Sequence, residues 1–321
     1  MKISVAMTTY NGAAFLREQL DSIFAQTRLP DELIVCDDRS IDETPQLLRE
    51  YQSRSPFPMN VIENDERLGS TKNFEKAVRL CSGEVIALCD QDDVWRPHKL
   101  SVFEQAFEAD PDLGVVLTNA DLIDKNGAPL RGDLWSRCRL TKKRQEVLNT
   151  SRRYDLLLGL PIATGATMAF RSRFMQLVLP IPTGSTTFIH DRWIAILIAA
   201  IARLTVIPDK LISYRLHAQQ QLGVGKVPLP LKAFIPHQCR SDAVGLASLN
   251  ERLQGNPSCC ENQYFWQSLR ERQRHVAART LFSRNPLRRV GQVVSEYLSG
   301  GYSPYPFSLI FSCKDLLVGT R

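Results

Sequence analysis

The feature that most constrains the fold is an alternation of short apolar strands with amphipathic helices over the first ~110 residues. Strand patterns cover residues 2–8, 32–36, 59–62 and 85–88, and apolar residues at helical spacing follow each of the first three. Alternation of this kind favours a parallel sheet wrapped by helices. We therefore predict an α/β fold that binds its ligands beyond the carboxyl ends of the strands.

Polar clusters follow three of these strands. Tyr10-Asn11 comes after the first strand, Asp37-Asp38 after the second, and Asp90-Gln91-Asp92-Asp93 after the fourth. In a parallel sheet these clusters share one rim. Three carboxylates within four residues repel one another, so the last cluster favours a divalent cation with oxygen ligands. A solvated acidic turn before a helix is the structural alternative.

Further elements follow in the rest of the chain. Strand patterns recur at residues 114–119, 163–171 and 211–217, and a helix is expected over residues 193–202. Residues 131–153 are polar and basic, and this composition predicts a mobile excursion of the chain. From Pro228 onward the pattern is helical.

Composition is that of a globular protein, with 44% hydrophobic and 23% charged residues. The chain opens on a strand pattern without a basic and apolar leader, and its eight cysteines show no paired metal-type spacing. No apolar run reaches the roughly 20 residues that span a bilayer. We therefore expect a cytoplasmic location, with the inner face of the membrane as a place of action.

Positive charge is concentrated at the C-terminal end. Residues 262–321 carry nine Lys/Arg and three acids, which accounts for the whole net charge of +6. Apolar residues run beside these charges from Leu281 to Leu298. A basic amphipathic stretch of this kind can lie on an anionic membrane; the alternative is a set of helices that covers the core with a solvated basic face. No nucleic-acid-binding motif is present, so we expect no nucleic-acid partner.

The ordered motifs resemble the family-2 glycosyltransferases, whose nucleotide-sugar-binding fold is called GT-A. The resemblance covers roughly residues 1–225, and its Asp-Gln-Asp-Asp-Val-Trp form is most similar to bacterial rhamnosyltransferase-like enzymes of surface polysaccharide synthesis. It implies a mostly parallel GT-A domain over residues 1–225 and a basic helical addition over residues 226–321. The motifs are Thr8-Thr9-Tyr10-Asn11-Gly12, Val35-Cys36-Asp37-Asp38-Arg39-Ser40 with Asp42 and Thr44, Gly69 with Asn73, Asp90 to Trp95, Gly165, His190-Asp191 and Tyr214-Arg215-Leu216-His217.

The resemblance assigns roles to individual residues. Asp38 matches the acid that accepts the imide N–H of uracil or thymine, with Tyr10 beside that ring; the alternative for Asp37-Asp38 is a turn that caps the next helix. A structural ion pair is the alternative for Arg215. The residues expected to bind the donor are Thr9, Tyr10, Asn11, Asp38, Asn73, Asp90, Gly165 and Arg215.

The resemblance also implies a metal and a base. Asp92, Asp93 and His217 would bind Mg²⁺ or Mn²⁺, which steadies the charge on the departing diphosphate. Asp191 matches the catalytic base that deprotonates the acceptor hydroxyl. Its structural alternative is N-capping of the helix that follows, because an acid there suits the helix dipole.

The implied activity is inverting transfer of one sugar, with rhamnose as a candidate, from a dTDP- or UDP-linked donor to a saccharide hydroxyl on a lipid-linked acceptor. The Gln-x-x-Arg-Trp motif of processive members is absent, because Ile189 stands where glutamine would precede Arg192-Trp193. The alternatives are a non-catalytic sugar-nucleotide or glycan-binding protein and a nucleotidyltransferase on a related fold. A dehydrogenase would need Gly-x-Gly-x-x-Gly after the first strand, where the chain has Thr9-Tyr10-Asn11-Gly12.

Overall fold

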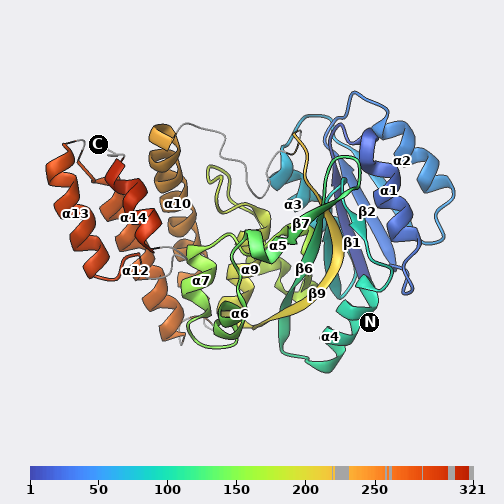
Figure 1. Ribbon diagram of the computed structural model, residues 1–321. Helices are drawn as coiled ribbons and strands as arrows, with labels where there is room; N and C mark the ends of the chain where they lie inside the picture. The colour runs from blue at the N-terminus through green and yellow to red at the C-terminus, as the bar shows by residue number, and fades with distance from the viewer. Residues whose placement is uncertain are drawn as a thin grey trace. The chain divides into compact units, whose positions relative to one another are not determined.

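The computed structural model describes residues 1–218, 220, 231–256, 259, 262–283, 285–302 and 308–317 (Figure 1). The chain divides into two compact units. Unit 1 comprises residues 1–137, 163–181 and 202–224, and unit 2 comprises residues 138–162, 182–201 and 225–321. The predicted domain boundary between residues 225 and 226 lies outside the described residues, as do Arg284 and Arg321 of the basic segment.

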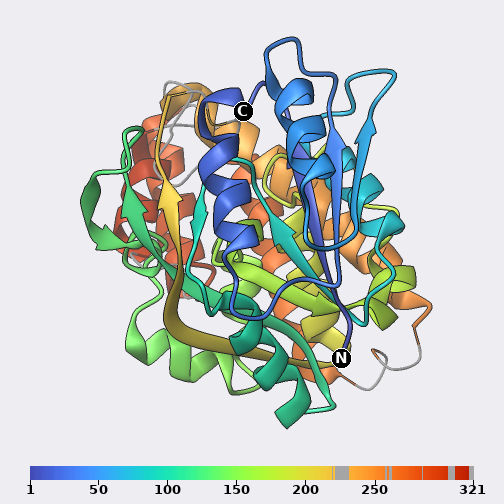
Figure 2. The same ribbon diagram turned by 90° about the vertical axis from the view of Figure 1, so that its right-hand side faces the viewer.

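Unit 1 contains the predicted parallel sheet (Figure 2). Its strands β1 (Ile3–Thr9), β2 (Glu32–Asp37), β3 (Met59–Glu63) and β4 (Val85–Cys89) pair in the order β3-β2-β1-β4, all parallel. Helices α1 (Ala13–Phe24), α2 (Thr44–Ser53) and α3 (Ser70–Leu80) connect them. Every residue of β1, β2 and β4 is buried, which explains their continuous apolar patterns.

Beyond β4 the sheet becomes mixed. Strand β8 (Met168–Arg171) pairs antiparallel with β4 and with β6 (Leu113–Ile123), and β9 (Arg203–Arg215) runs parallel to β6. The short strands β5 (Val94–Trp95) and β7 (Pro129–Asp133) pair antiparallel with β9 and β6. Helix α4 (Lys99–Ala109) joins β5 to β6.

Two local expectations need correction. The strand predicted over residues 163–171 forms only at β8, because Thr167 donates to Thr164 O through both its N–H and its hydroxyl and closes the turn η1 (Gly165–Thr167). The excursion predicted over residues 131–153 is instead built from β7, α5 (Leu134–Arg137), α6 (Lys142–Leu148) and the start of α7 (Arg153–Gly159). Its few apolar side chains anchor it by burial: Leu134, Trp135, Leu140 and Leu148.

Unit 2 is mainly helical in its described residues, and α9 and the helices after residue 230 confirm the predicted helices. It contains α6, α7, α9 (His190–Ile201), α10 (Leu231–Gln254), α12 (Gln263–Thr280), α13 (Pro286–Leu298) and α14 (Ser308–Leu317). Helix α9 is buried on nearly all sides, which accounts for its unbroken apolar run. Among the described residues, no helix combines the length and the apolar character needed to cross a bilayer.

Candidate functional site

The candidate site lies where the parallel strands of unit 1 end. Thr9 at the end of β1 is in register with Asp37 at the end of β2, and Met7 of β1 is in register with Cys89 of β4. The polar residues that follow these strands therefore emerge from one rim of the sheet, as the sequence predicts.

Asp37 has a structural task at this rim. Its carboxylate accepts hydrogen bonds from the hydroxyls of Thr9 (2.7 Å) and Ser40 (2.6 Å) and from the Ser40 N–H (2.8 Å). Asp37 therefore closes a turn with Ser40 and binds Thr9, but it does not cap α2, whose N-cap is Glu43. Of this acidic pair, Asp38 remains the candidate for ligand recognition.

Asp38 is buried in a nest of donors. Its Oδ1 accepts from Leu68 N–H (2.7 Å) and Asn64 Nδ2 (3.1 Å), and its Oδ2 accepts from Gly69 N–H (2.8 Å). Gly69 has φ of 79°, a conformation that favours glycine. A carboxylate offers about four lone-pair positions. Three donors therefore fix its orientation and leave Oδ2 room for one more.

Asn73 supports this nest from α3. Its Nδ2 donates to Cys36 O (2.8 Å), and its Oδ1 accepts from Asn64 Nδ2 (2.9 Å). Its side chain is buried and engaged at both ends within the protein. It therefore braces the residues that hold Asp38.

The turn after β1 is tied to its neighbours. Gln91 accepts from the Tyr10 N–H (2.8 Å) and donates to the Tyr10 carbonyl (3.1 Å). Asn11, with φ of 47°, accepts from Ile41 N–H through its side chain. The guanidinium carbon of the exposed Arg67 lies 3.9 Å from the centre of the Tyr10 ring. Tyr10 thus presents a ring on a fixed backbone.

Asp92 and His217 meet at the same rim. His217 Nε2 lies 2.8 Å from Asp92 Oδ2, and the His217 ring packs on Phe15 with centroids 4.6 Å apart. These residues are 125 positions apart in sequence, yet the end of β9 brings them together. A carboxylate and an imidazole side by side can bind one divalent cation.

Asp93 is deeper. Its Oδ1 accepts from the Arg215 N–H (2.9 Å). Burial, with the neighbouring charges of Asp92 and Asp90, raises the pKa of Asp93 well above its usual value. The partly buried Asp90 adds to a negative field that a cation would relieve.

Arg215 is a brace between several segments. Its Nε donates to Asp92 O (2.7 Å), and its Nη2 forms an ion pair with Glu18 of α1. The guanidinium also reaches the carbonyls of Asp124 and Lys125. These contacts support the alternative that Arg215 has a structural role. Contact between Arg215 and phosphate stays a prediction.

Behind the acidic cluster lies a buried lysine. The Nζ of Lys99 donates to Ala166 O (2.6 Å) and lies 3.6 Å from the centre of the Trp95 ring. Burial lowers the pKa of Lys99 to about 7, against the raising effect of nearby Cys89 and Asp93. Lys99 thereby fixes the turn that contains Gly165.

Asp191 belongs to unit 2, whereas the other candidate residues belong to unit 1. It lies in the first turn of α9, half-buried, and its Oδ1 accepts from the Arg192 N–H (2.6 Å). An acid in this place suits the helix dipole. This contact supports the structural alternative at the start of α9. The role of Asp191 as a base stays a prediction.

Sequence reasoning missed several supporting residues. Asn64 and Arg67 precede Gly69 in a loop without a recognisable motif, Glu18 lies on the surface pattern of α1, and Lys99 reads as an ordinary helical lysine. The apolar residues that flank Lys99, Leu100 and Phe103, were the available signal that this helix start is buried.

A divalent cation fits the donor groups at the rim. Within the described residues, no three His, Cys, Asp or Glu side chains gather as a ready-made metal cluster. The Asp92–His217 pair instead suits an ion that takes its remaining ligands from phosphate oxygens and water. Of the three predicted metal ligands, the structure brings these two together and engages Asp93 with Arg215.

Comparison with known proteins decides the family. The profile described as Glycosyl transferase family 2 matches residues 4–177, more than half of the 321-residue chain. The chain belongs to glycosyl transferase family 2. The resemblance inferred from the ordered motifs is thereby confirmed.

Relatives in this family match over part of their length. An uncharacterized glycosyltransferase of Nostoc sp. is 34% identical over 126 residues, covering 39% of this chain and 38% of that protein. The dTDP-rhamnosyl transferase RfbG of Shigella flexneri is 33% identical over 98 residues, covering 29% of this chain and 34% of that protein. The chain thus matches well under half the length of either relative.

Solved structures share the fold. TarS of S. aureus in complex with UDP-GlcNAc superposes with a TM-score of 0.59 at 18% identity, covering 98% of this chain and 88% of that one. The mannosyltransferase PcManGT of Pyrobaculum calidifontis, in complex with GDP-Man and Mn²⁺, gives 0.58 at 21% identity, covering 98% and 85%. The predicted GT-A fold is confirmed.

Proposed function

We propose that this chain is an inverting, metal-dependent glycosyltransferase that moves a single sugar from a nucleoside-diphosphate donor to a saccharide hydroxyl. The observation that carries the proposal is the shared rim of unit 1. There the nested Asp38 carboxylate, the Tyr10 ring and the Asp92–His217 pair follow the ends of neighbouring strands. These groups match the base, the ring face and the diphosphate of a nucleotide sugar.

The donor base would be read by Asp38. The position left on Oδ2 can accept one N–H, and the imide of uracil or thymine supplies one. Because Arg67 is exposed, its side chain can swing aside and let the base stack on Tyr10. We therefore infer a dTDP- or UDP-linked donor; the match to RfbG makes rhamnose the first sugar to test.

In the proposed reaction, Asp191 removes the proton from the acceptor hydroxyl. The oxygen attacks the anomeric carbon as the bond from that carbon to the diphosphate oxygen breaks on the opposite face, which inverts the configuration. The proton ends on Asp191, and the electron pair leaves with the nucleoside diphosphate. Mg²⁺ or Mn²⁺ held by Asp92 and His217 would supply positive charge against the diphosphate oxygens.

Calorimetric titration tests this assignment. We expect dTDP-rhamnose or UDP-GlcNAc to bind at least about tenfold more tightly with Mn²⁺ than with EDTA, a difference of ~1.4 kcal/mol, and GDP-mannose to bind more weakly. The expectation follows from the single hydrogen-bond acceptor position left at Asp38 and from the Asp92–His217 pair, which is proposed to bind one cation. Tight binding that EDTA leaves unchanged would contradict the scheme.

Turnover separates an enzyme from a binding protein. We would follow release of the nucleoside diphosphate from each donor over hours, without acceptor and with pooled lipid-linked saccharides. A catalyst releases it faster than donor alone decays, and faster still with its acceptor. Binding without release would favour the non-catalytic alternative.

A lipid-linked acceptor would require a membrane surface, and α13 offers a candidate contact. Leu287 is 86% exposed and Leu298 is 79% exposed, with further exposed apolar side chains between them. Their spacing keeps them on one side of the helix. We propose that this stripe lies on an anionic membrane; it consists of Leu287, Val290, Val294, Tyr297 and Leu298.

The basic residues contribute less to this surface than their number suggests. Arg272 and Arg279 are buried in ion pairs with Asp242 and Asp315, and Arg289 is buried against the carbonyls of Ser283 and Leu316. His275 is also buried. Among the described side chains of residues 262–317, the exposed cations are Arg270, Arg274 and Arg288, and Glu271 is an exposed acid beside them. We therefore propose that the apolar stripe supplies most of the binding.

Flotation with vesicles tests the membrane proposal. Leu287→Asp in the full chain is expected to reduce binding to phosphatidylcholine–phosphatidylglycerol vesicles about tenfold or more, because a buried leucine contributes ~1.5–3 kcal/mol. Ile41→Asp is the matched control, since Ile41 is 87% exposed in unit 1. Equal flotation of the two variants would reject the stripe as the contact.

A further inference from the structure

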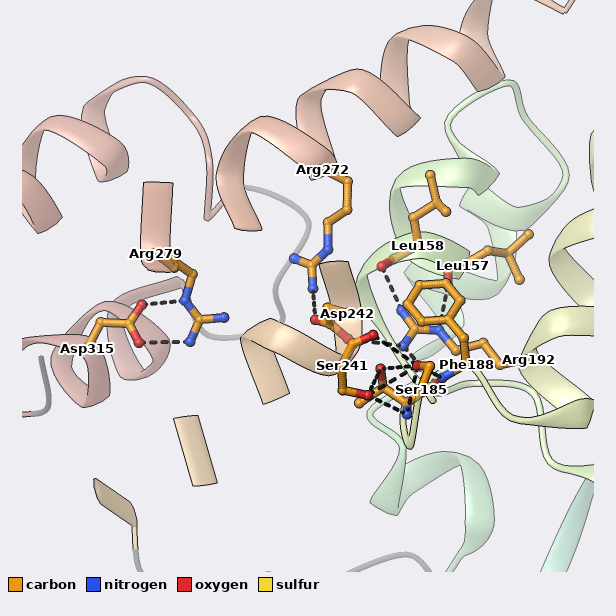
Figure 3. A network of polar contacts seen from close by, with 11 residues as sticks. Leu157, Leu158, Ser185, Phe188, Arg192, Ser241, Asp242, Arg272, Arg279 and Asp315 are labelled. Carbon is orange, nitrogen blue, oxygen red and sulfur yellow. Dashed lines mark hydrogen bonds and ion pairs between the residues drawn. The ribbon is translucent and has the colours of Figure 1, made fainter. Parts of the chain in front are cut away.

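Helix α10 supports the segment that leads into Asp191. The Ser241 Oγ accepts from the N–H groups of Thr186 (2.7 Å) and Thr187 (3.1 Å). In return, the Ser185 hydroxyl donates to the Ser241 carbonyl (3.0 Å) and accepts from Phe188 N–H (3.0 Å). Figure 3 shows Ser185 and Ser241 facing each other beside Phe188. The 185–188 loop is therefore hydrogen-bonded to one turn of α10.

One turn further along α10, a glycine makes room for the same loop. A Cβ on Gly245 would lie 2.2 Å from Phe188 Cδ2 and 2.7 Å from Phe188 Cβ. Contacts this close cannot be relieved by rotating the ring alone, because the Phe188 Cβ is itself involved. The absence of a side chain at Gly245 thus determines where Phe188, three residues before Asp191, can lie.

Arg192 fixes the other side of Asp191. Its buried guanidinium donates to Leu158 O (2.6 Å), Leu157 O (3.3 Å) and Thr187 O (3.2 Å), and it lies 4.1 Å from the centre of the Phe188 ring (Figure 3). The Leu157 and Leu158 carbonyls belong to the last turn of α7, where helix carbonyls lack partners within the helix. The cation thus ties the start of α9 to the end of α7.

Asp242 completes the support. It accepts from Arg272 Nη2 of α12 (2.9 Å), and its Oδ1 lies 3.9 Å from Arg192 Nη1. All of these side chains are buried, so their positions are strongly restrained. Three other helices of unit 2, α7, α10 and α12, therefore determine where α9 begins.

We propose that Ser241, Gly245 and Arg192 are positioning residues that hold the Asp191 carboxylate where it can act on the acceptor. The inference rests on the proposed role of Asp191 as base. It gives the C-terminal helices a part in catalysis, because α10 carries the contacts that locate the 185–188 loop. A displacement of about 1 Å at a reacting group can cost ~10²-fold in rate.

The test compares matched substitutions in the full chain. Gly245→Ala is expected to lower kcat about 10- to 100-fold through displacement of Phe188. Gly291→Ala, whose Cβ would meet no described atom within 4 Å, is expected to leave kcat unchanged. Ser241→Ala should lower kcat in the same way. Ser248→Ala should not, because it removes only a bond from Ser248 to Val244 O within α10.

Three further measurements distinguish a positioning role from a loss of folded protein. Positioning leaves the donor dissociation constant, the number of donor sites per chain and the melting temperature near those of the wild type while kcat falls. A fall in kcat matched by fewer donor sites or by early melting would overturn the proposal. Wild-type kcat in both Gly245→Ala and Ser241→Ala would overturn it as well.

A double-mutant cycle with Asp191→Asn distinguishes this inference from the proposed function. A residue that acts through Asp191 should lose its effect on the residual transfer rate once the carboxylate is gone. The same fold-loss from Gly245→Ala in both backgrounds would overturn the positioning role. Full activity of Asp191→Asn alone would instead reject the base assignment.

Discussion

Asp191→Asn is expected to lower the rate of sugar transfer about 10²- to 10⁴-fold, the range that a positioned general base contributes. The amide has the size of the carboxylate but cannot take up the acceptor proton at neutral pH. Its Oδ1 can still accept from the Arg192 N–H, so the start of α9 should be preserved. The loss should therefore be chemical rather than structural.

The measurement is kcat with saturating donor and acceptor, beside the donor dissociation constant from calorimetry. The constant should change less than about twofold, because Asp191 is proposed to act on the acceptor hydroxyl and not to bind the donor. Asp209→Asn, at an exposed position of β9, is the matched control and should transfer normally. Transfer by Asp191→Asn at the control rate would remove this residue from the mechanism.

The parallel part of the fold was predictable because burial on both faces leaves a direct mark. Residues 3–9 and 85–89 are buried throughout, and between Ile3 and Met7 and between Val85 and Cys89 only Ser4 is polar. The position of the polar clusters then follows from topology alone. The sequence alone therefore predicts that Asp38 and Asp92 share one rim.

The partners of the site residues could not be predicted in the same way. Asp38 is held by the main-chain N–H groups of Leu68 and Gly69, and main-chain donors carry no residue signature. Arg215 is paired with Glu18, which is 197 positions away and has the pattern of a surface acid. A sequence motif shows which residue is present. Only the folded structure shows which hydrogen-bond and ion-pair partners that residue already has.

The net charge of the C-terminal helices exceeds their exposed positive charge for a related reason. The count over residues 262–321 includes Arg272, whose partner Asp242 lies in α10 and outside the counted segment. It also treats Arg279 as a surface charge, although Arg279 forms a buried ion pair with Asp315. The Tyr302 hydroxyl donates a hydrogen bond to the same Asp315 carboxylate. A local sum cannot separate charges that neutralise one another in the core from charges that face solvent.

The metal pair supplies the other large expected effect. Asp92→Asn is expected to weaken Mn²⁺-dependent donor binding by about 100-fold or more, beyond what loss of a supporting contact to a metal ligand usually costs. The side chain keeps its shape, and one of its oxygens becomes an NH₂ group that cannot bind a cation. His217→Gln should produce a loss of the same kind, because Nε2 lies 2.8 Å from the Asp92 carboxylate.

Donor titrations across a range of Mn²⁺ concentrations measure this effect, and the double variant shows whether the two residues share one ion. If they do, the combined loss will be much smaller than the product of the single losses, since the first change already removes the site. Asp124→Asn is a suitable control, because Asp124 accepts backbone N–H groups of its own turn. Full Mn²⁺ dependence in Asp92→Asn would place the cation elsewhere, and multiplying losses would mean that Asp92 and His217 act on the donor separately.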